Sequence, residues 1–131
     1  MPATLDHILF VEDDPDIQAV AQLALEAVGG FRVTVCQSGR EALAIAEQAN
    51  PDLILLDVMM PEMDGPGTLA NLRKLATTAT TPVIFMTAKV QPHEVAQFRA
   101  LGALDVIAKP FDPMTLADTI RDRWAAHQAS L

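Results

Sequence analysis

Four short apolar segments of this chain each run into a polar side chain, and this repeated pattern constrains the fold more than any other feature. The four segments and the polar residues that close them are 7–11 with Glu12, 51–56 with Asp57, 82–86 with Thr87, and 105–108 with Lys109. Short, nearly continuous apolar runs are typical of strands buried on both faces. A charge at the tip of such a strand is costly for structure alone, so these positions indicate function.

Helical sequence patterns fill the stretches between the strands. The first predicted helix ends at Gly29–Gly30, and its apolar face consists of Ile17, Val20, Ala21, Ala24, Leu25 and Val28. A second helix opens at Ser38, in a predicted capping box with Glu41, and runs to about Gln48. The remaining predicted helices span 66–76, 92–101 and 113–127, with inward positions at Leu69, Leu72 and Ala76 in the first of these and Leu116, Ile120 and Trp124 in the last.

A further strand at 31–36 completes five β-α units. This alternation predicts an α/β fold with a parallel sheet between two helix layers. The expected form is a flavodoxin-like, doubly wound sheet of five strands in the order 2-1-3-4-5 with five helices. Because the chain has 131 residues and no linker-like or repeated stretch, we expect a single domain over 1–131 with its core at about 7–127.

Composition excludes several classes of function. The formal net charge is −8 and the nine basic residues are scattered, which argues against a nucleic-acid-binding surface. Cys36 is the only cysteine, so no disulfide can form within the chain, and we interpret it as a small buried hydrophobe. No signal-peptide pattern and no membrane-length apolar run occurs. We therefore expect a soluble, cytoplasmic protein that does not contact membranes.

The predicted topology brings the residues at the strand ends together in one site. Parallel strands end at one edge of a sheet, where ligands bind at the switch point between strands one and three. Glu12, Asp13 and Asp57 would bring a formal charge of −3 to that edge and Lys109 would return +1. A divalent cation would neutralise the remainder, and an all-oxygen ligand set favours Mg²⁺. Neither His nor Cys follows these strands closely, which argues against zinc.

Each of these residues also has a purely structural interpretation. A carboxylate after a strand is often a helix N-cap, and we assign that role to Asp14, which precedes a proline and is left out of the metal site. Taken alone, Glu12 and Asp13 could equally be caps, Thr87 a turn residue and Lys109 a solvated charge. Their coincidence at one sheet edge favours a functional site.

Four motifs together resemble the receiver domain of two-component response regulators. They are Leu-Phe-Val-Glu-Asp-Asp-Pro-Asp-Ile at 9–17, Asp57 with Met-Pro-Glu-Met-Asp-Gly at 60–65, Met-Thr-Ala at 86–88, and Lys-Pro-Phe at 109–111. The resemblance extends over about 7–124. It is specific because the motifs occur in combination, whereas an isolated Lys-Pro or acidic triplet would carry little weight.

The resemblance implies a phosphoacceptor switch. Asp57 would take a phosphoryl group from a sensor histidine kinase or a phosphotransfer protein, and Thr87 and Lys109 would contact the phosphoryl oxygens. The implied Mg²⁺ ligands are Glu12, Asp13, Asp57 and the backbone carbonyl of Met59. The chain would act on a downstream protein target, with a homodimer through the fourth helix, fifth strand and fifth helix as a further expectation. No enzyme activity is expected beyond self-phosphorylation and self-dephosphorylation.

Two positions depart from the family pattern. Glu12 stands where Asp is common, and we expect metal binding to survive the extra methylene. Val106 stands where Tyr or Phe is usual, three residues before Lys109. A stiff β-branched side chain cannot make the inward swing of that aromatic ring. We therefore expect the phosphorylation chemistry to be intact and the readout to be altered.

Alternative functions are less consistent with the sequence. A degenerate receiver that binds or dimerises without phosphorylation is favoured only by Val106. A flavin- or nucleotide-binding protein would have to place a phosphate against three acids, 12–14, where backbone donors are needed. A hydrolase with Asp57 as nucleophile lacks a nearby general acid. Since the chain stops just after the fifth predicted helix, we expect a chemotaxis-type single-domain regulator or a phosphorelay intermediate.

Overall fold

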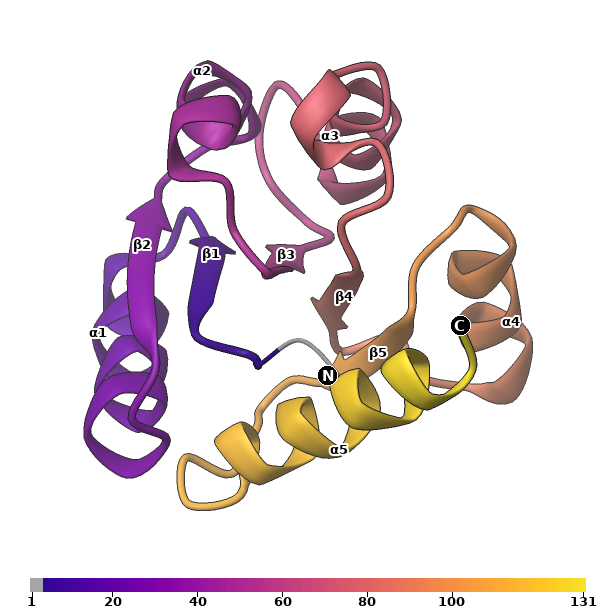
Figure 1. Ribbon diagram of the computed structural model, residues 1–131. Helices are drawn as coiled ribbons and strands as arrows, with labels where there is room; N and C mark the ends of the chain where they lie inside the picture. The colour runs from indigo at the N-terminus through magenta and orange to yellow at the C-terminus, as the bar shows by residue number, and fades with distance from the viewer. Residues whose placement is uncertain (1–3) are drawn as a thin grey trace.

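The computed structural model describes residues 4–131 and shows a parallel sheet with helices on both faces (Figure 1). Residues 1–3 of the predicted domain lie outside the described part. The strands are β1 (His7–Val11), β2 (Arg32–Cys36), β3 (Leu53–Asp57), β4 (Val83–Thr87) and β5 (Asp105–Ala108). They pair in parallel in the order β2-β1-β3-β4-β5. The predicted flavodoxin-like fold and strand order are confirmed.

Helices connect the successive strands. They are α1 (Pro15–Leu23), α2 (Gly39–Ala49), α3 (Gly65–Leu72), α4 (Pro92–Ala100) and α5 (Leu116–Ala129). A π-helical turn, η1 (Ala24–Val28), continues α1, and a short 3₁₀ turn, η2 (Ala76–Thr78), follows α3. None of the helices within residues 4–131 combines the length and the apolar character that a bilayer crossing requires.

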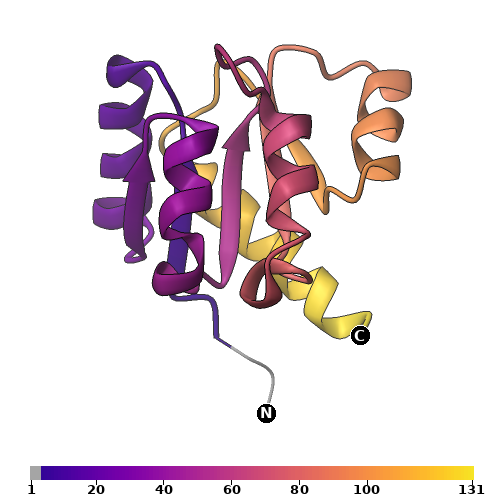
Figure 2. The same cartoon turned by 90° about the horizontal axis from the view of Figure 1, so that it is seen from above.

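The sheet divides the apolar core into two layers. One layer packs side chains of β1 and β3 against α1, η1 and α5, with Leu25, Ile120 and Trp124 buried. The other packs the opposite faces of the same strands against α2 and α3, with Leu69 and Leu72 buried. Figure 2 shows α2 and α3 in front of the sheet and α5 behind it. The strands are thus covered on both faces, and their carboxyl ends remain accessible.

Several helix details differ from the prediction. In the first helix Ala21, Ala24 and Leu25 are buried, but Val20 and Val28 are 47% and 49% exposed. The π-helical turn, closed by the bond from Gly29 N–H to the carbonyl oxygen of Ala24, widens the helix and changes which side chains face the sheet.

The third helix ends at Leu72 and not at Ala76, which is exposed. The hydroxyl of Thr78 donates to the Leu72 carbonyl oxygen at 2.5 Å, so a side chain takes an acceptor at the end of the helix. The fifth helix begins at Leu116, three residues later than predicted, and its Leu116, Ile120 and Trp124 stripe is buried as expected.

Candidate functional site

The carboxyl ends of β1, β3, β4 and β5 surround a cleft of about 280 Å³. All the residues that the sequence singled out as site candidates line this cleft. The lining residues are Glu12, Asp13, Asp14, Ile17, Asp57, Met59, Thr87, Ala88 and Lys109. Residues up to 97 positions apart in the chain are therefore assembled by the parallel sheet alone.

Three carboxylates form the acidic part of the cleft. Glu12, Asp13 and Asp57 each place one carboxylate oxygen within 4.8 Å of the others. Glu12 and Asp57 are only 1% and 3% exposed, whereas Asp13 is exposed. Two negative charges are thus held away from bulk water, and this arrangement requires compensating positive charge.

Lys109 supplies part of that compensation. Its Nζ donates to Glu12 Oε1 at 2.6 Å and to Asp57 Oδ1 at 2.9 Å. The lysine follows β5, its backbone N–H donates to the carbonyl oxygen of Thr87 at 2.9 Å, and the Lys109–Pro110 peptide bond is cis. The ammonium group therefore bridges the two buried acids, one at the end of β1 and one at the end of β3.

Glu12 is the most deeply buried of the three acids, and its carboxyl group has a raised pKa. The pKa of its carboxyl group is raised to about 7, mainly by burial; the hydrogen bond from Lys109 lowers the pKa and the neighbouring Asp57 raises it, and burial with Asp57 outweighs Lys109. The backbone N–H of Glu12 donates to the carbonyl oxygen of Cys36 at 2.9 Å, and the Asp14 N–H donates to Glu12 Oε2 at 3.3 Å. A nearby cation would favour the ionised form of this side chain.

Thr87 ends β4 next to the acids. It is 2% exposed, and its Oγ1 accepts a hydrogen bond from the backbone N–H of Lys89 at 3.1 Å. In the strand register Asp57 lies beside Met86 and Thr87 lies beside Ala108, so the hydroxyl occupies the same rim as the carboxylates. A hydroxyl can rotate to donate to an anion in the cleft.

The predicted N-cap role of Asp14 is confirmed. Its Oδ1 accepts from the backbone N–H groups of Asp16 at 2.8 Å and Ile17 at 3.3 Å, at the start of α1. Asp64 caps α3 in the same way through Gly67 N–H at 2.8 Å. Both carboxylates thus accept hydrogen bonds from backbone N–H groups in the first turn of a helix, as expected for an N-cap.

Gly65 lets the loop after β3 pass close behind Asp57. A Cβ atom at this position would lie 2.6 Å from the carbonyl oxygen of Asp57 and 2.8 Å from Val58 Cα. Backbone packing next to the site therefore requires glycine at this position, where α3 begins.

The donor set fits a hard divalent cation. Three carboxylate oxygens lie within 4.8 Å of one another, and the ligand atoms are all oxygen, which suits Mg²⁺. The acids carry a formal −3 and Lys109 carries +1, so a doubly charged ion would neutralise the cluster. Met59 lines the same cleft, with its side chain 67% exposed.

Comparison with known sequences agrees with this geometry. Residues 8–121 match the family described as the response regulator receiver domain. The chain belongs to this family. Over 115 residues it is 40% identical to the transcriptional regulatory protein CseB of Streptomyces coelicolor, and the match covers 88% of the chain and 47% of CseB. The receiver domain thus spans about half the length of the curated relatives that it matches.

Solved structures of the family have the same fold as this receiver domain. The chemotaxis response regulator CheY4 of Vibrio cholerae superposes with a TM-score of 0.84 at 32% identity, covering 92% of this chain and 99% of CheY4. The receiver domain of the sensor histidine kinase PA1611 from Pseudomonas aeruginosa, solved with magnesium in its active-site cleft, gives 0.80 at 30% identity and covers 93% and 99%. A structural neighbour of the same family therefore holds magnesium in its own active-site cleft.

One residue at the edge of the site, Gln18, was not predicted from the sequence. Gln18 of α1 donates from its side-chain Nε2 to the backbone carbonyl oxygen of Glu12 at 2.5 Å. Its position one turn after the Asp14 cap was visible in the sequence, but the partner was not, because the contact depends on how the loop after β1 bends. The receiver domain thus has a direct link between α1 and the acidic loop.

Proposed function

We propose that this receiver domain is a phosphoacceptor switch in a two-component or phosphorelay system, with Asp57 as the phosphoacceptor. The observation that carries the proposal is the placement of Lys109 Nζ within 2.9 Å of Asp57 and 2.6 Å of Glu12. An ammonium group at that point lies beside the nucleophile and can also contact a phosphoryl oxygen. The donor would be a phosphohistidine on a sensor kinase or phosphotransfer protein.

The chemistry requires little beyond positioning and charge. An Asp57 carboxylate oxygen bonds to phosphorus as the P–N bond of the donor breaks, and the imidazole leaves with the electron pair. Thr87 donates its hydroxyl to a phosphoryl oxygen and Lys109 turns its ammonium to another. Mg²⁺ held by Glu12, Asp13, Asp57 and the Met59 carbonyl would neutralise negative charge on the transferring group.

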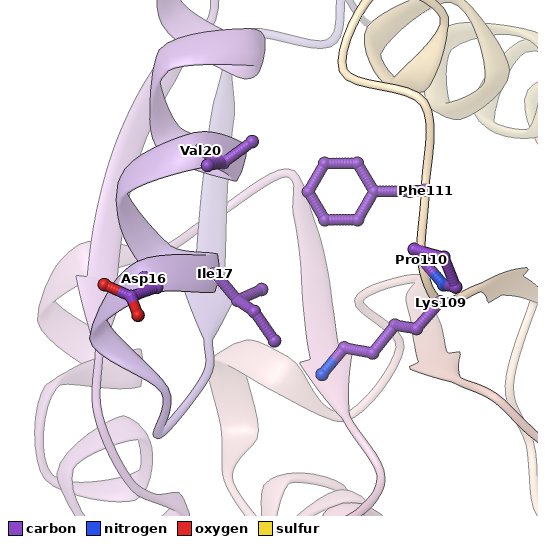
Figure 3. Close-up of a pocket in the computed structure, with 6 residues that line it drawn as sticks. All are labelled: Asp16, Ile17, Val20, Lys109, Pro110 and Phe111. Atoms are coloured by element: carbon purple, nitrogen blue, oxygen red, sulfur yellow. The ribbon is translucent and has the colours of Figure 1, made fainter.

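An apolar pocket beside the cleft offers a contact surface for the phosphoryl donor. It has a volume of about 270 Å³ and is lined by Asp16, Ile17, Val20, Lys109, Pro110 and Phe111. Figure 3 shows Phe111, after β5, pointing toward Ile17 and Val20 of α1. Because the pocket shares Lys109 and Ile17 with the cleft, a helix seated here could present a histidine to Asp57.

Output would follow through protein contacts. Phosphorylation adds negative charge at the cleft, which draws the Thr87 hydroxyl and its loop inward and alters the surface near α4. We propose a downstream protein target, a homodimer through α4, β5 and α5, and a cytoplasmic location. Nucleic-acid and membrane binding are not part of the proposed function. The alternative is a degenerate receiver that binds partners without phosphorylation, which the complete set of cleft residues disfavours.

Incubation with a small acyl phosphate tests this function. We expect intact-mass measurement to show the gain of one phosphoryl group in the presence of Mg²⁺, no gain after chelation, and no gain in Asp57→Asn. An unchanged mass for the natural sequence with Mg²⁺ would instead support the phosphorylation-independent binding module.

A further inference from the structure

Gln18 connects α1 to the loop that carries two of the acids. The residue is half-buried, and its backbone N–H donates to the Asp14 carbonyl oxygen at 2.9 Å in the first turn of the helix. Its side-chain amide reaches back and donates to the Glu12 carbonyl oxygen at 2.5 Å. The helix therefore supplies a rigid base from which one side chain holds the loop.

The carbonyl group that Gln18 contacts belongs to the peptide unit joining Glu12 to Asp13. On the other side of Glu12, the backbone N–H donates to Cys36 at 2.9 Å. The backbone of Glu12 is thus held on one side by β2 and on the other by α1. Asp13 is exposed, so the direction of its carboxylate depends on the orientation of this preceding peptide plane.

We propose that Gln18 is a positioning residue for the metal site, orienting the Glu12–Asp13 peptide so that both carboxylates reach one Mg²⁺ ion. This inference rests on the proposed function. Residues that hold metal ligands in place without touching the metal commonly change affinity by about 10- to 100-fold when they are replaced. Gln18 holds a backbone segment instead of a ligand side chain, so we expect an effect near the lower end of that range.

Two substitutions separate positioning from electrostatics. Gln18→Met keeps the length of the side chain but removes its hydrogen-bond donor. Gln18→Glu keeps the length, removes the donor, and adds a negative charge near the site. If charge alone mattered, the glutamate would strengthen cation binding, whereas the positioning role predicts that it weakens it because two acceptors then face each other.

Gln22→Met is the matched control. Gln22 lies one turn further along α1, and its Nε2 donates to Glu26 Oε1 at 2.8 Å, away from the acidic loop. Mg²⁺ affinity is measured by isothermal titration calorimetry of the full chain, with folding checked by circular dichroism. We expect roughly tenfold weaker binding for Gln18→Met and for Gln18→Glu, and no change for Gln22→Met.

A metal-free readout accompanies the titration. Without Mg²⁺, the Glu12 amide, which donates to the Cys36 carbonyl oxygen, should exchange with solvent faster in Gln18→Met than in the natural sequence or in Gln22→Met. Affinity within about twofold of the natural sequence for Gln18→Met, or tighter binding for Gln18→Glu, overturns the inference. The proposed function is judged separately: it fails if the natural sequence gains no phosphoryl group with Mg²⁺, whereas the role of Gln18 is judged by the Mg²⁺ affinities of the variants.

Discussion

Thr87 Oγ1 accepts a hydrogen bond from the backbone N–H of Lys89 at 3.1 Å, so the hydroxyl at the end of β4 holds the loop that leads into α4. The same hydroxyl is the group that we expect to turn toward a phosphoryl oxygen at Asp57. Because a hydroxyl can accept one hydrogen bond while it donates another, a movement of Thr87 toward a phosphoryl group would draw Lys89 and its loop with it. This relationship gives a direct route from the site to α4.

Thr87→Val tests that route. The substitution keeps the shape of the side chain but removes the acceptor, so the Lys89 amide should exchange with solvent about fivefold faster, as expected for the loss of a hydrogen bond worth roughly 1 kcal/mol. Hydrogen exchange followed by NMR measures this. Thr87→Ser, which retains the hydroxyl, is the control, and equal exchange in all three proteins would refute the link.

Val106→Tyr should change the readout without changing the chemistry. Val106 is half-buried against the core layer that contains Phe98 of α4, where Phe98 packs edge-to-face on Phe85 with ring centroids 5.3 Å apart. A tyrosine ring needs more room than valine and would alter how α4 rests on β5.

We therefore expect phosphorylation of Val106→Tyr by a small acyl phosphate to stay within about twofold of the natural rate, while amide shifts in α4 on phosphorylation change clearly. Intact mass and NMR provide the two measurements. A comparable loss of phosphorylation and of the α4 response would contradict the separation of chemistry from readout.

Glu12 should make the stability of the metal-free protein depend on pH. Its folded pKa is about 7 against an ordinary value of 4.5, so between these values the folded state keeps a proton that the unfolded state releases. The free energy of unfolding should fall as pH rises from 4.5 to 7, by up to roughly 3 kcal/mol from this group.

Urea unfolding with a chelator, repeated for Glu12→Gln, isolates that contribution. The glutamine variant should gain stability relative to the natural sequence as pH rises through the window. Added Mg²⁺ should restore the natural protein at neutral pH, because the ion favours ionised Glu12. Parallel pH curves for the two proteins would rule out a raised pKa at Glu12.

Asp105 should hold α4 and α5 together. Its carboxylate accepts from Arg99 Nη2 of α4 at 2.8 Å and also pairs with Arg123 of α5. Burial raises the pKa of Asp105, but the two arginines and the Val106 N–H outweigh burial and lower it below the ordinary 3.8. The stabilisation is therefore present above pH 3.8 and is lost as pH falls through the lower folded pKa.

Asp105→Asn should lower the free energy of unfolding at neutral pH by about 1–2 kcal/mol, since both guanidinium groups are half exposed and water replaces part of the contact. Urea unfolding measures the change. The loss should shrink in acid, where the natural carboxylate is protonated. Arg32→Gln, which breaks an exposed pair with Asp6, is the control and should have little effect.

The fold and the cleft could be predicted because each strand and the polar residue at its end can be recognised from a short segment of sequence. A strand that ends at Asp57 needs no knowledge of the rest of the chain to be recognised, and parallel pairing then brings all the strand ends together. The role of Asp14 was equally local, since a cap contacts residues of its own helix.

Details that depend on distant or bent backbone could not be predicted. The end of α3 is set by Thr78, six residues beyond Leu72, and the periodic pattern contains no sign of that hydroxyl contact. Val28, at the end of the π-helical turn that follows α1, is exposed against its apparent phase, and Val20 is exposed because it lines the open pocket beside the cleft. Lys109 was expected at the cleft, but its bridge to both Glu12 and Asp57 follows from side-chain geometry alone.

None of the residues of α4 is buried. Because α4 buries no residue completely, it loses few packing contacts when it shifts, and the free-energy cost of moving it is low. Under the proposed function, phosphorylation of Asp57 would have to supply only a few kcal/mol to redistribute so weakly held a helix, whereas a helix anchored in the core would need more. The weak packing of α4 therefore determines how small a free-energy change at the cleft would be enough to move this helix.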